Sequence, residues 1–343
     1  MIYHVINLIE ERRHASSDLA VHAGERVRRV SGVALVSVLL VVALASAIAS
    51  QMISRQSLTI AHARHVFEGG QARQYAFGAE TYARQLLFED WSNNNALDTL
   101  LENWALPIRP FEIEGGRIEL AIVDLERRLN LNAVRSPKNL QRFKRLLAQL
   151  ELDPNLADAW LDWIDGDETV YGYGAEDEDY LLAQPAYRAA NQPAASASAM
   201  LAVKGFTKAA YERLMPHVAL LPDSELRVNA NTAGGTVLYS LGASFATEEA
   251  EAPAESAREF KDIAEAVTQY PGLRDSVEAL TVTSAFFEVQ VRVDLGDARA
   301  ELVSTLYRDP VTGRIWLLGR DFGRRVPSTY EAVPAGTETA GDT

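Results

Sequence analysis

The sequence predicts an α+β protein with a long N-terminal helix that begins in a membrane, an antiparallel sheet and a large inserted helical domain. Val33–Ile53 is an uncharged, mostly aliphatic run, long enough to span a bilayer at about 1.5 Å per residue. Alternating apolar stretches typical of strands occur at 118–123 and between 277 and 319. Between them, helical signals extend over 136–221.

The composition of the chain limits its partners and its chemistry. A formal net charge of -14 argues against nucleic acid or an anionic membrane surface as the main partner. The chain has no Cys, which excludes disulfides, thiolate nucleophiles and Cys-ligated zinc. Arg26, Arg28 and Arg29 precede the apolar run, so the positive-inside rule leaves the N-terminus in the cytoplasm. In a bacterial inner membrane, the remainder would lie in the periplasm.

The segment before the apolar run suggests processing. A buried core helix is one alternative for 33–53, and Ala45–Ala47 could be the cleavage site of an ordinary secretory signal. A basic segment that ends in Gly32, directly before the apolar helix, resembles instead the leader of type IV pilins and of type II secretion pseudopilins. The resemblance implies that a prepilin peptidase cuts between Gly32 and Val33. Residues 1–32 are long for such a leader, so a long leader and a downstream start of translation both stay open.

The predicted N-terminal helix covers 33–92. Apolar residues recur near a 3.6 period from Arg55 to Trp91, and the three Asn at 93–95 favour a turn. In most pilins the fifth mature residue is a Glu that is thought to pair with the terminal amine of a neighbouring subunit. Here that position is Ser37, which cannot offer this charge. The absence of the Glu fits a subunit at the end of the fibre, above which no further subunit is added.

The first part of the head, at 93–135, contains the strand 118–123 followed by Asp124, Asn130 and Asn132. This segment resembles the Asp-Leu and Asn-Leu-Asn signature of the type II secretion minor pseudopilin of the K type, which implies a pilin-like fold. From the residues alone, it is an Asx-rich turn in which Asn130 and Asn132 bond their own backbone. Both interpretations can hold together.

The inserted helical domain is expected at 136–275. Ser136 and Pro137 form a cap for a helix that extends to Leu150, and Asp153–Pro154 begins a second helix that turns Trp160 and Trp163 inward. Large K-type subunits carry such an insertion.

An acidic loop follows this second helix, with eight carboxylates in 162–179 and no adjacent Lys or Arg. Their repulsion is relieved by a hard divalent cation, Ca²⁺ or Mg²⁺, although a solvated acidic loop is the alternative. EF-hand spacing from Asp165 puts Val170 where Gly is required, which excludes an EF-hand. The loop resembles the Asp-Trp-Ile-Asp and Gly-Ala-Glu-Asp stretches of K-type pseudopilins, whose helical domain binds calcium. The predicted ligands are Asp165, Asp167, Glu176, Asp177 and Asp179.

The stretch 227–233 resembles a segment shared by K-type pseudopilins and helix-hairpin-helix DNA-uptake proteins. Glutamates that follow at 248–255 would repel phosphates, so a structural role is favoured, with Asn229 and Asn231 fixing a turn and capping the next helix. The C-terminal strands of the head are expected at 276–325 and a disordered tail at 326–343.

The resemblance covers roughly 32–323 and implies a role in assembly. The chain would occupy the tip of a periplasmic pseudopilus and help start its assembly. Implied partners are other minor pseudopilins, the inner-membrane platform, the prepilin peptidase and exoprotein substrates, with the chain crossing the inner membrane once. No enzyme is predicted, because the acids crowd into one hydrophilic loop and no Gly-x-Ser-x-Gly or phosphate-loop motif occurs. The alternatives are a single-span periplasmic binding protein and a helix-hairpin-helix DNA-binding protein.

Overall fold

A computed structural model describes residues 3–93, 96–242 and 257–328, with side chains described from Val33 onward. The chain divides into two compact units, residues 1–67 and 68–343. Helix α1 (Tyr3–Asn93) runs through both and ends at the predicted Asn stop. The stretch from Val33 is long and apolar enough to cross a membrane by length and composition, and none of the side chains in its most apolar window is buried. Gly69 and Gly70 do not interrupt the helix.

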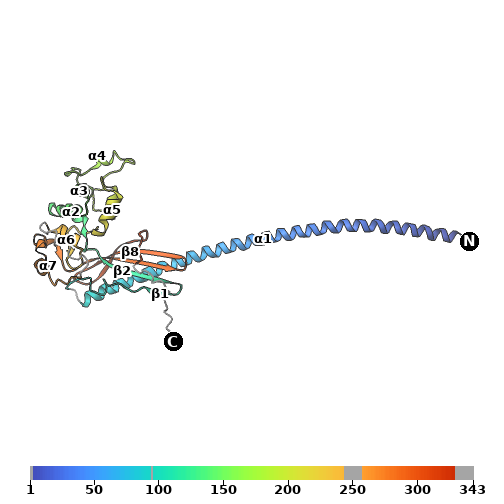
Figure 1. Cartoon of the computed structure of the whole chain (residues 1–343), viewed down its shortest axis with the longest axis horizontal. Helices are drawn as coiled ribbons and strands as arrows, with labels where there is room; N and C mark the ends of the chain where they lie inside the picture. Colours follow the sequence, from blue (N-terminus) through green and yellow to red (C-terminus); the bar gives the residue numbers. More distant parts are fainter. Residues whose placement is uncertain (1–2, 94–95, 243–256, 329–343) are drawn as a thin grey trace, which may run out of the picture. The chain divides into compact units, whose positions relative to one another are not determined.

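The second unit contains a five-stranded antiparallel sheet with the strand order β1-β2-β7-β8-β9 (Figure 1). Its strands are β1 (Phe111–Ile113), β2 (Gly116–Asp124), β7 (Phe286–Leu295), β8 (Ala298–Arg308) and β9 (Ile315–Asp321). The strand predicted at 118–123 lies within β2 and pairs with the first C-terminal strand, β7, where Ile118 lies opposite Val293. β2 and β7 are neighbours in the sheet although residues 125–285 separate them, so the helical region is inserted between paired strands.

Two predicted strand features need correction. The first C-terminal strand begins at Phe286 and not at Val277, because Pro271–Ala279 form a 3₁₀ helix (η5) and Leu280–Thr281 form the short strand β6. Strand β1 was not predicted, since three residues are too few for a recognisable alternation.

The last third of α1 packs against one face of this sheet. Ala72, Ala76, Ala83 and Leu87 are completely buried there with the alternating apolar residues of β2, β7 and β8. Small side chains on the helix let its backbone approach the sheet closely, so the strand residues fill the interface. The buried Glu80 lies at this interface and accepts hydrogen bonds from Ser304 (2.7 Å) and Arg320 (2.6 Å).

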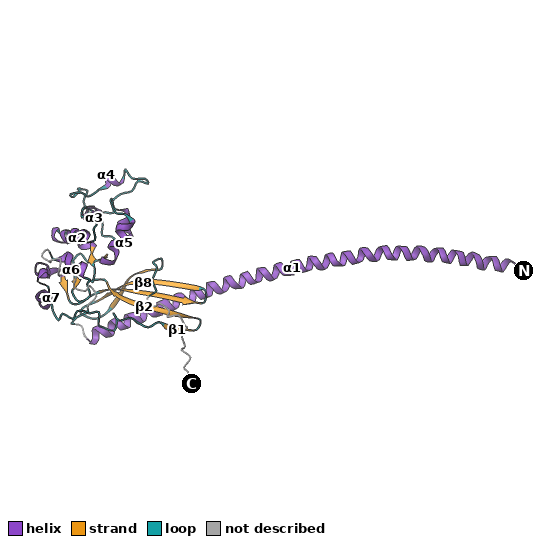
Figure 2. Ribbon diagram, in the orientation of Figure 1, coloured by secondary structure: helices purple, strands orange, loops and turns teal. Residues whose placement is uncertain are grey.

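The inserted region is less helical than the pattern predicted (Figure 2). Loops connect its elements: α2 (Pro137–Gln149), α3 (Leu156–Ile164), α4 (Asp177–Tyr180), α5 (Lys208–Leu214), α6 (Gly235–Leu241), α7 (Ile263–Gln269), and the 3₁₀ helices η1 (Leu131–Ala133), η2 (Ala197–Ala202) and η3 (Met215–His217). Two short parallel ladders join β3 (Leu129–Asn130) to β4 (Val218–Ala219) and β5 (Val228–Asn229) to β6. These ladders return the chain from the insertion toward the sheet.

The cap and the core predicted for this region are confirmed. The Ser136 hydroxyl accepts from the Asn139 amide at 3.2 Å and Pro137 opens α2. Trp160 and Trp163 of α3 are buried, and the Trp160 indole donates to the Leu131 carbonyl at 3.0 Å. Helix α3 begins at Leu156, two residues after the predicted start.

The end of the described chain crosses the sheet face opposite α1. Arg324 pairs with Glu288 of β7 at 2.5 Å, and the Ser328 hydroxyl donates to Glu119 of β2 at 3.0 Å. Val326 is buried, so the first residues of the predicted disordered tail are packed. The rest of that tail, 329–343, and the whole acidic stretch at 248–255 lie outside the described residues.

Candidate metal centre and polar junction

Three of the predicted ligands meet at the C-terminal end of α3. Asp165 directly follows that helix, Asp167 lies in the turn after it, and Glu176 precedes α4. One carboxylate oxygen from each lies within 4.8 Å of the others. Such spacing suits a common ion, because Ca²⁺ binds each carboxylate oxygen at about 2.3–2.6 Å.

Glu176 is the best evidence that the cluster needs a cation. Only 3% of the residue is exposed, and neither carboxylate oxygen has a hydrogen-bond partner among the described residues. Burial raises the pKa of Glu176 to about 7, with further repulsion from Asp162 and Asp165. A buried, unpaired carboxylate is costly, so a bound divalent ion is the natural compensation.

Two buried aspartates on α3 shape the loop that carries these ligands. Asp162 accepts from the Tyr171 amide at 3.2 Å, and Asp158 accepts from the Tyr173 amide at 3.3 Å. A Cβ at Gly174 would lie 1.9 Å from an Asp162 oxygen, so only glycine fits there. The sequence indicated the acidic composition of this segment, but not that Asp158 and Asp162 would anchor the loop instead of binding the ion.

Asp177 and Asp179 do not join the cluster, which corrects two predicted ligands. Asp177 pairs with Arg188 at 2.5 Å and accepts from the Ala189 amide at 2.9 Å. Asp179 pairs with Lys204 at 2.8 Å. These cations come from later segments, so the absence of Lys and Arg next to the acids in sequence did not mean that each acid lacked a cation.

The Asn-Leu-Asn segment connects distant parts of the insertion. Asn130 forms the predicted local turn, because its Oδ1 accepts from the Asn132 amide at 3.1 Å, and it also accepts from the Leu221 amide at 3.0 Å. Asn132 was expected to bond its own backbone. Instead, its side chain accepts from the Ala194 amide (2.9 Å) and donates to the Ala194 and Leu221 carbonyls (3.0 Å each).

Asn229 and Asn231 act similarly. The Asn229 Oδ1 accepts from the Asn231 amide at 2.9 Å, which confirms the predicted turn. Neither residue caps the next helix, because α6 follows Gly234, which has no side chain. Asn231 instead accepts from the Phe260 amide and donates to its carbonyl. Both Asn side chains are completely buried and are not available to phosphates.

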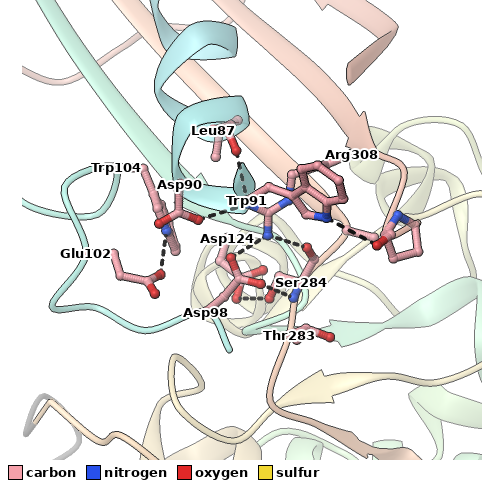
Figure 3. Close-up of polar contacts among 12 residues, drawn as sticks. Leu87, Asp90, Trp91, Asp98, Glu102, Trp104, Asp124, Thr283, Ser284 and Arg308 are labelled. Carbon is pink, nitrogen blue, oxygen red and sulfur yellow. Dashed lines mark hydrogen bonds and ion pairs between the residues drawn. The ribbon is translucent and has the colours of Figure 1, made fainter. Parts of the chain in front are cut away.

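Asn229 contacts a buried polar junction. This junction is defined here as Asp90, Asp98, Asp124, Ser284 and Arg308 (Figure 3). Arg308 of β8 pairs with Asp98 and with Asp90 of α1, the latter at 3.0 Å. The Ser284 hydroxyl donates to Asp124 at 2.7 Å, and its amide donates to Asp98 at 2.7 Å.

Asn229 donates to the Asp98 carbonyl at 3.0 Å, so the junction also reaches the inserted region. The end of α1, the sheet and the insertion therefore meet at this junction, around Arg308.

Carboxyls at and beside this junction should make stability depend on pH. Burial is the largest cause that raises the pKa of Asp90 to about 7, of Asp124 to about 6 and of Glu126 to about 8. Each binds its proton more tightly when folded than when unfolded, where the pKa is about 4. The free energy of unfolding should therefore fall as pH rises from about 5 to about 8.

Urea unfolding across this range, in saturating calcium, measures the dependence. D90N should reduce the slope, because an amide has no proton to lose. An identical slope in D90N and wild type would contradict this assignment.

At the predicted processing site, Gly32 and Val33 lie within the continuous helix α1. The Ser37 hydroxyl donates to the Val33 carbonyl at 2.7 Å. Ser37 therefore satisfies its hydroxyl within its own helix and offers no charge to a neighbouring amine.

Comparisons with known proteins agree with this architecture. The family model described as type II secretion system (T2SS), protein K matches residues 127–223. Type II secretion system protein K of Pseudomonas aeruginosa is 36% identical, with 88% of this chain and 96% of that protein covered. The protein K of Klebsiella pneumoniae is 33% identical, over 86% and 95% of the two chains.

The fold also matches a solved structure. A chain in the crystal structure of the GspK-GspI-GspJ complex from enterotoxigenic Escherichia coli aligns with a TM-score of 0.69 at 24% identity, covering 77% of this chain and all of that one. The sequence identity to these relatives, the region inserted between β2 and β7 and the long N-terminal helix all point to the same family. This chain belongs to the type II secretion system protein K family of minor pseudopilins.

Proposed function

We propose that this protein sits at the tip of a periplasmic pseudopilus, where it helps to start pseudopilus assembly and exoprotein secretion. The observation that carries the proposal is helix α1, which is apolar and unpacked at 33–53 and packed against the sheet from Ala72 to Leu87. Such a helix can anchor a subunit in the inner membrane and remain part of its folded head. The solved relative was crystallised with GspI and GspJ, which supports other minor pseudopilins as partners. The proposed partners also include the inner-membrane platform, the prepilin peptidase and exoproteins.

Processing at Gly32–Val33 is part of this proposal. Mass spectrometry of protein isolated from its native membrane should find a mature chain that begins with a methylated Val33. The wild type should be compared with a variant changed at Gly32, which should stay at precursor mass. An uncut Gly32–Val33 bond in the wild type would favour a single-span periplasmic binding protein.

A tip position predicts that charge at Ser37 is not needed. S37E should be cleaved normally, because the change lies inside the mature helix. Secretion should fall measurably, because a new carboxylate in the apolar helix has no partner and is unfavourable within the membrane. S37A is the control and should secrete normally. Normal secretion by S37E would mean that the missing charge is incidental.

We further propose that Asp165, Asp167 and Glu176 bind one calcium ion, which completes the fold of the acidic loop. Three carboxylates supply hard oxygen ligands, and backbone carbonyls or water would complete the coordination. The ion would neutralise the Glu176 carboxylate, whose oxygens have no other described partner. Its role is structural, in holding the distal part of the insertion in one conformation.

A further inference from the structure

A cleft of about 550 Å³ separates the inserted region from the sheet face opposite α1. Ser198 and Tyr211 line one wall, and Val303 of β8 and Leu125 line the other. Arg128 also lines this cleft and is partly buried. The walls therefore combine apolar surface, hydroxyl groups and charged side chains, among them Arg128, Arg320 and Arg324.

The Arg128 side chain forms no salt bridge among the described residues, although Glu288 attracts its charge from a greater distance. Its Nε is buried without an acceptor, and no ion pair or side-chain hydrogen bond of Arg128 is found in the described part of the chain. Burial lowers the pKa of Arg128, which reflects the cost of holding its charge there. A guanidinium in this state is uncommon, because buried charges are normally paired.

Other charges at the cleft are already engaged. Glu288 pairs with Arg324 at 2.5 Å, and Arg320 pairs with Glu80 at 2.6 Å. Of the three arginines among the described residues that line the cleft, Arg128 is therefore the one without a salt bridge. Its planar fork of donors matches a carboxylate, with which it can form two parallel hydrogen bonds.

We propose that this cleft binds a carboxylate carried on an apolar polypeptide segment, with Arg128 as the anchoring cation. Leu125 and Val303 contact the apolar flanks, and the hydroxyls of Ser198 and Tyr211 lie within the same cleft to receive polar groups. This site is separate from the proposed calcium ligands, none of which lines the cleft. It would give the protein a second means of contact with a partner chain, besides its helix α1.

Equilibrium dialysis of the full-length protein in detergent micelles, with calcium present, tests the proposal. The probes are two pools of N-acetylated, C-amidated hexapeptides with random Ala, Leu, Val and Ser flanks, identical except for a fixed central Glu or Gln. Mass spectrometry measures the peptide retained. The Glu pool should be retained roughly tenfold more than the Gln pool, because only the carboxylate forms a bidentate ion pair with Arg128.

R128Q should reduce that ratio to about one, as expected when the charged donor is lost. R127Q removes the same charge from the adjacent residue, which lies outside the cleft lining, and should keep the ratio. S198E, at an exposed position on the cleft wall, should lower retention by placing a competing carboxylate there without changing the core. Near-UV circular dichroism checks that each variant is folded.

Acetate at millimolar concentration distinguishes the source of the carboxylate. Failure of acetate to displace the Glu pool supports a polypeptide as the source, whereas complete displacement by acetate would overturn the assignment to a polypeptide segment. Equal retention of both pools by the wild type, or a ratio unchanged in folded R128Q, would overturn the proposal.

Discussion

Removal of calcium should lower the Tm of this protein by on the order of 10 °C. An ion held about a thousandfold above its Kd stabilises the folded state by about 4 kcal/mol. For a folded unit of this size, each kcal/mol corresponds to roughly 2–4 °C. The physical source is Glu176, whose two buried oxygens have no described partner without an ion. Calorimetry of the full chain in millimolar Ca²⁺ and in EDTA measures the difference.

The variant E176Q separates ion binding from general damage. With no charge at this position, added calcium should raise the Tm much less than in the wild type. In EDTA, E176Q should be more stable than the wild type, because the substitution removes one repelling charge from beside Asp165 and Asp167. Glu178→Gln is the matched control, since Glu178 is exposed in the same loop. It should keep the full calcium response.

Equal melting curves in EDTA and in calcium would rule out the metal centre. Variants D177N and D179N sharpen the result. They should retain calcium binding, because the structure pairs these two acids with Arg188 and Lys204. Loss of calcium binding in either variant would show that the substituted aspartate is a calcium ligand after all.

Replacement of Arg308 should have the second large effect. R308M removes the cation that pairs with Asp90 and Asp98 and leaves Asp98 buried without it. Removing one partner of a buried pair typically costs about 3–5 kcal/mol. The free energy of unfolding, measured with urea in saturating calcium, should fall by that amount. Near-UV circular dichroism reports the loss, because Trp104 packs beside the junction (Figure 3).

R299M is the control for this substitution. Arg299 lies on the same strand and pairs with Asp294 at 2.6 Å, but on the exposed surface. Its replacement should leave the urea midpoint close to that of the wild type, because water replaces the lost partner. A similar loss in both variants would show that the junction contributes no more than a surface ion pair.

Local signals carried most of the fold prediction. The Asn residues at 93–95 and the Ser136 cap each depend on neighbours a few residues away, and the described helices end at Asn93 and begin at Pro137 accordingly. The start of the first helix was predicted wrongly, because α1 begins at Tyr3 and not at Val33. Strand β8 lies within the predicted C-terminal strand region, because its alternation continues over eleven residues. Shorter elements such as β1 and β6 had no comparable signal.

Within the candidate site, the sequence by itself determined where the carboxylates are dense, and therefore where a hard cation would bind. Only the tertiary structure decided that Asp165, Asp167 and Glu176 meet while Asp177 and Asp179 turn to Arg188 and Lys204. The physical reason is that a buried charge takes whichever partner the packing brings within reach, and that partner can come from a segment remote in sequence.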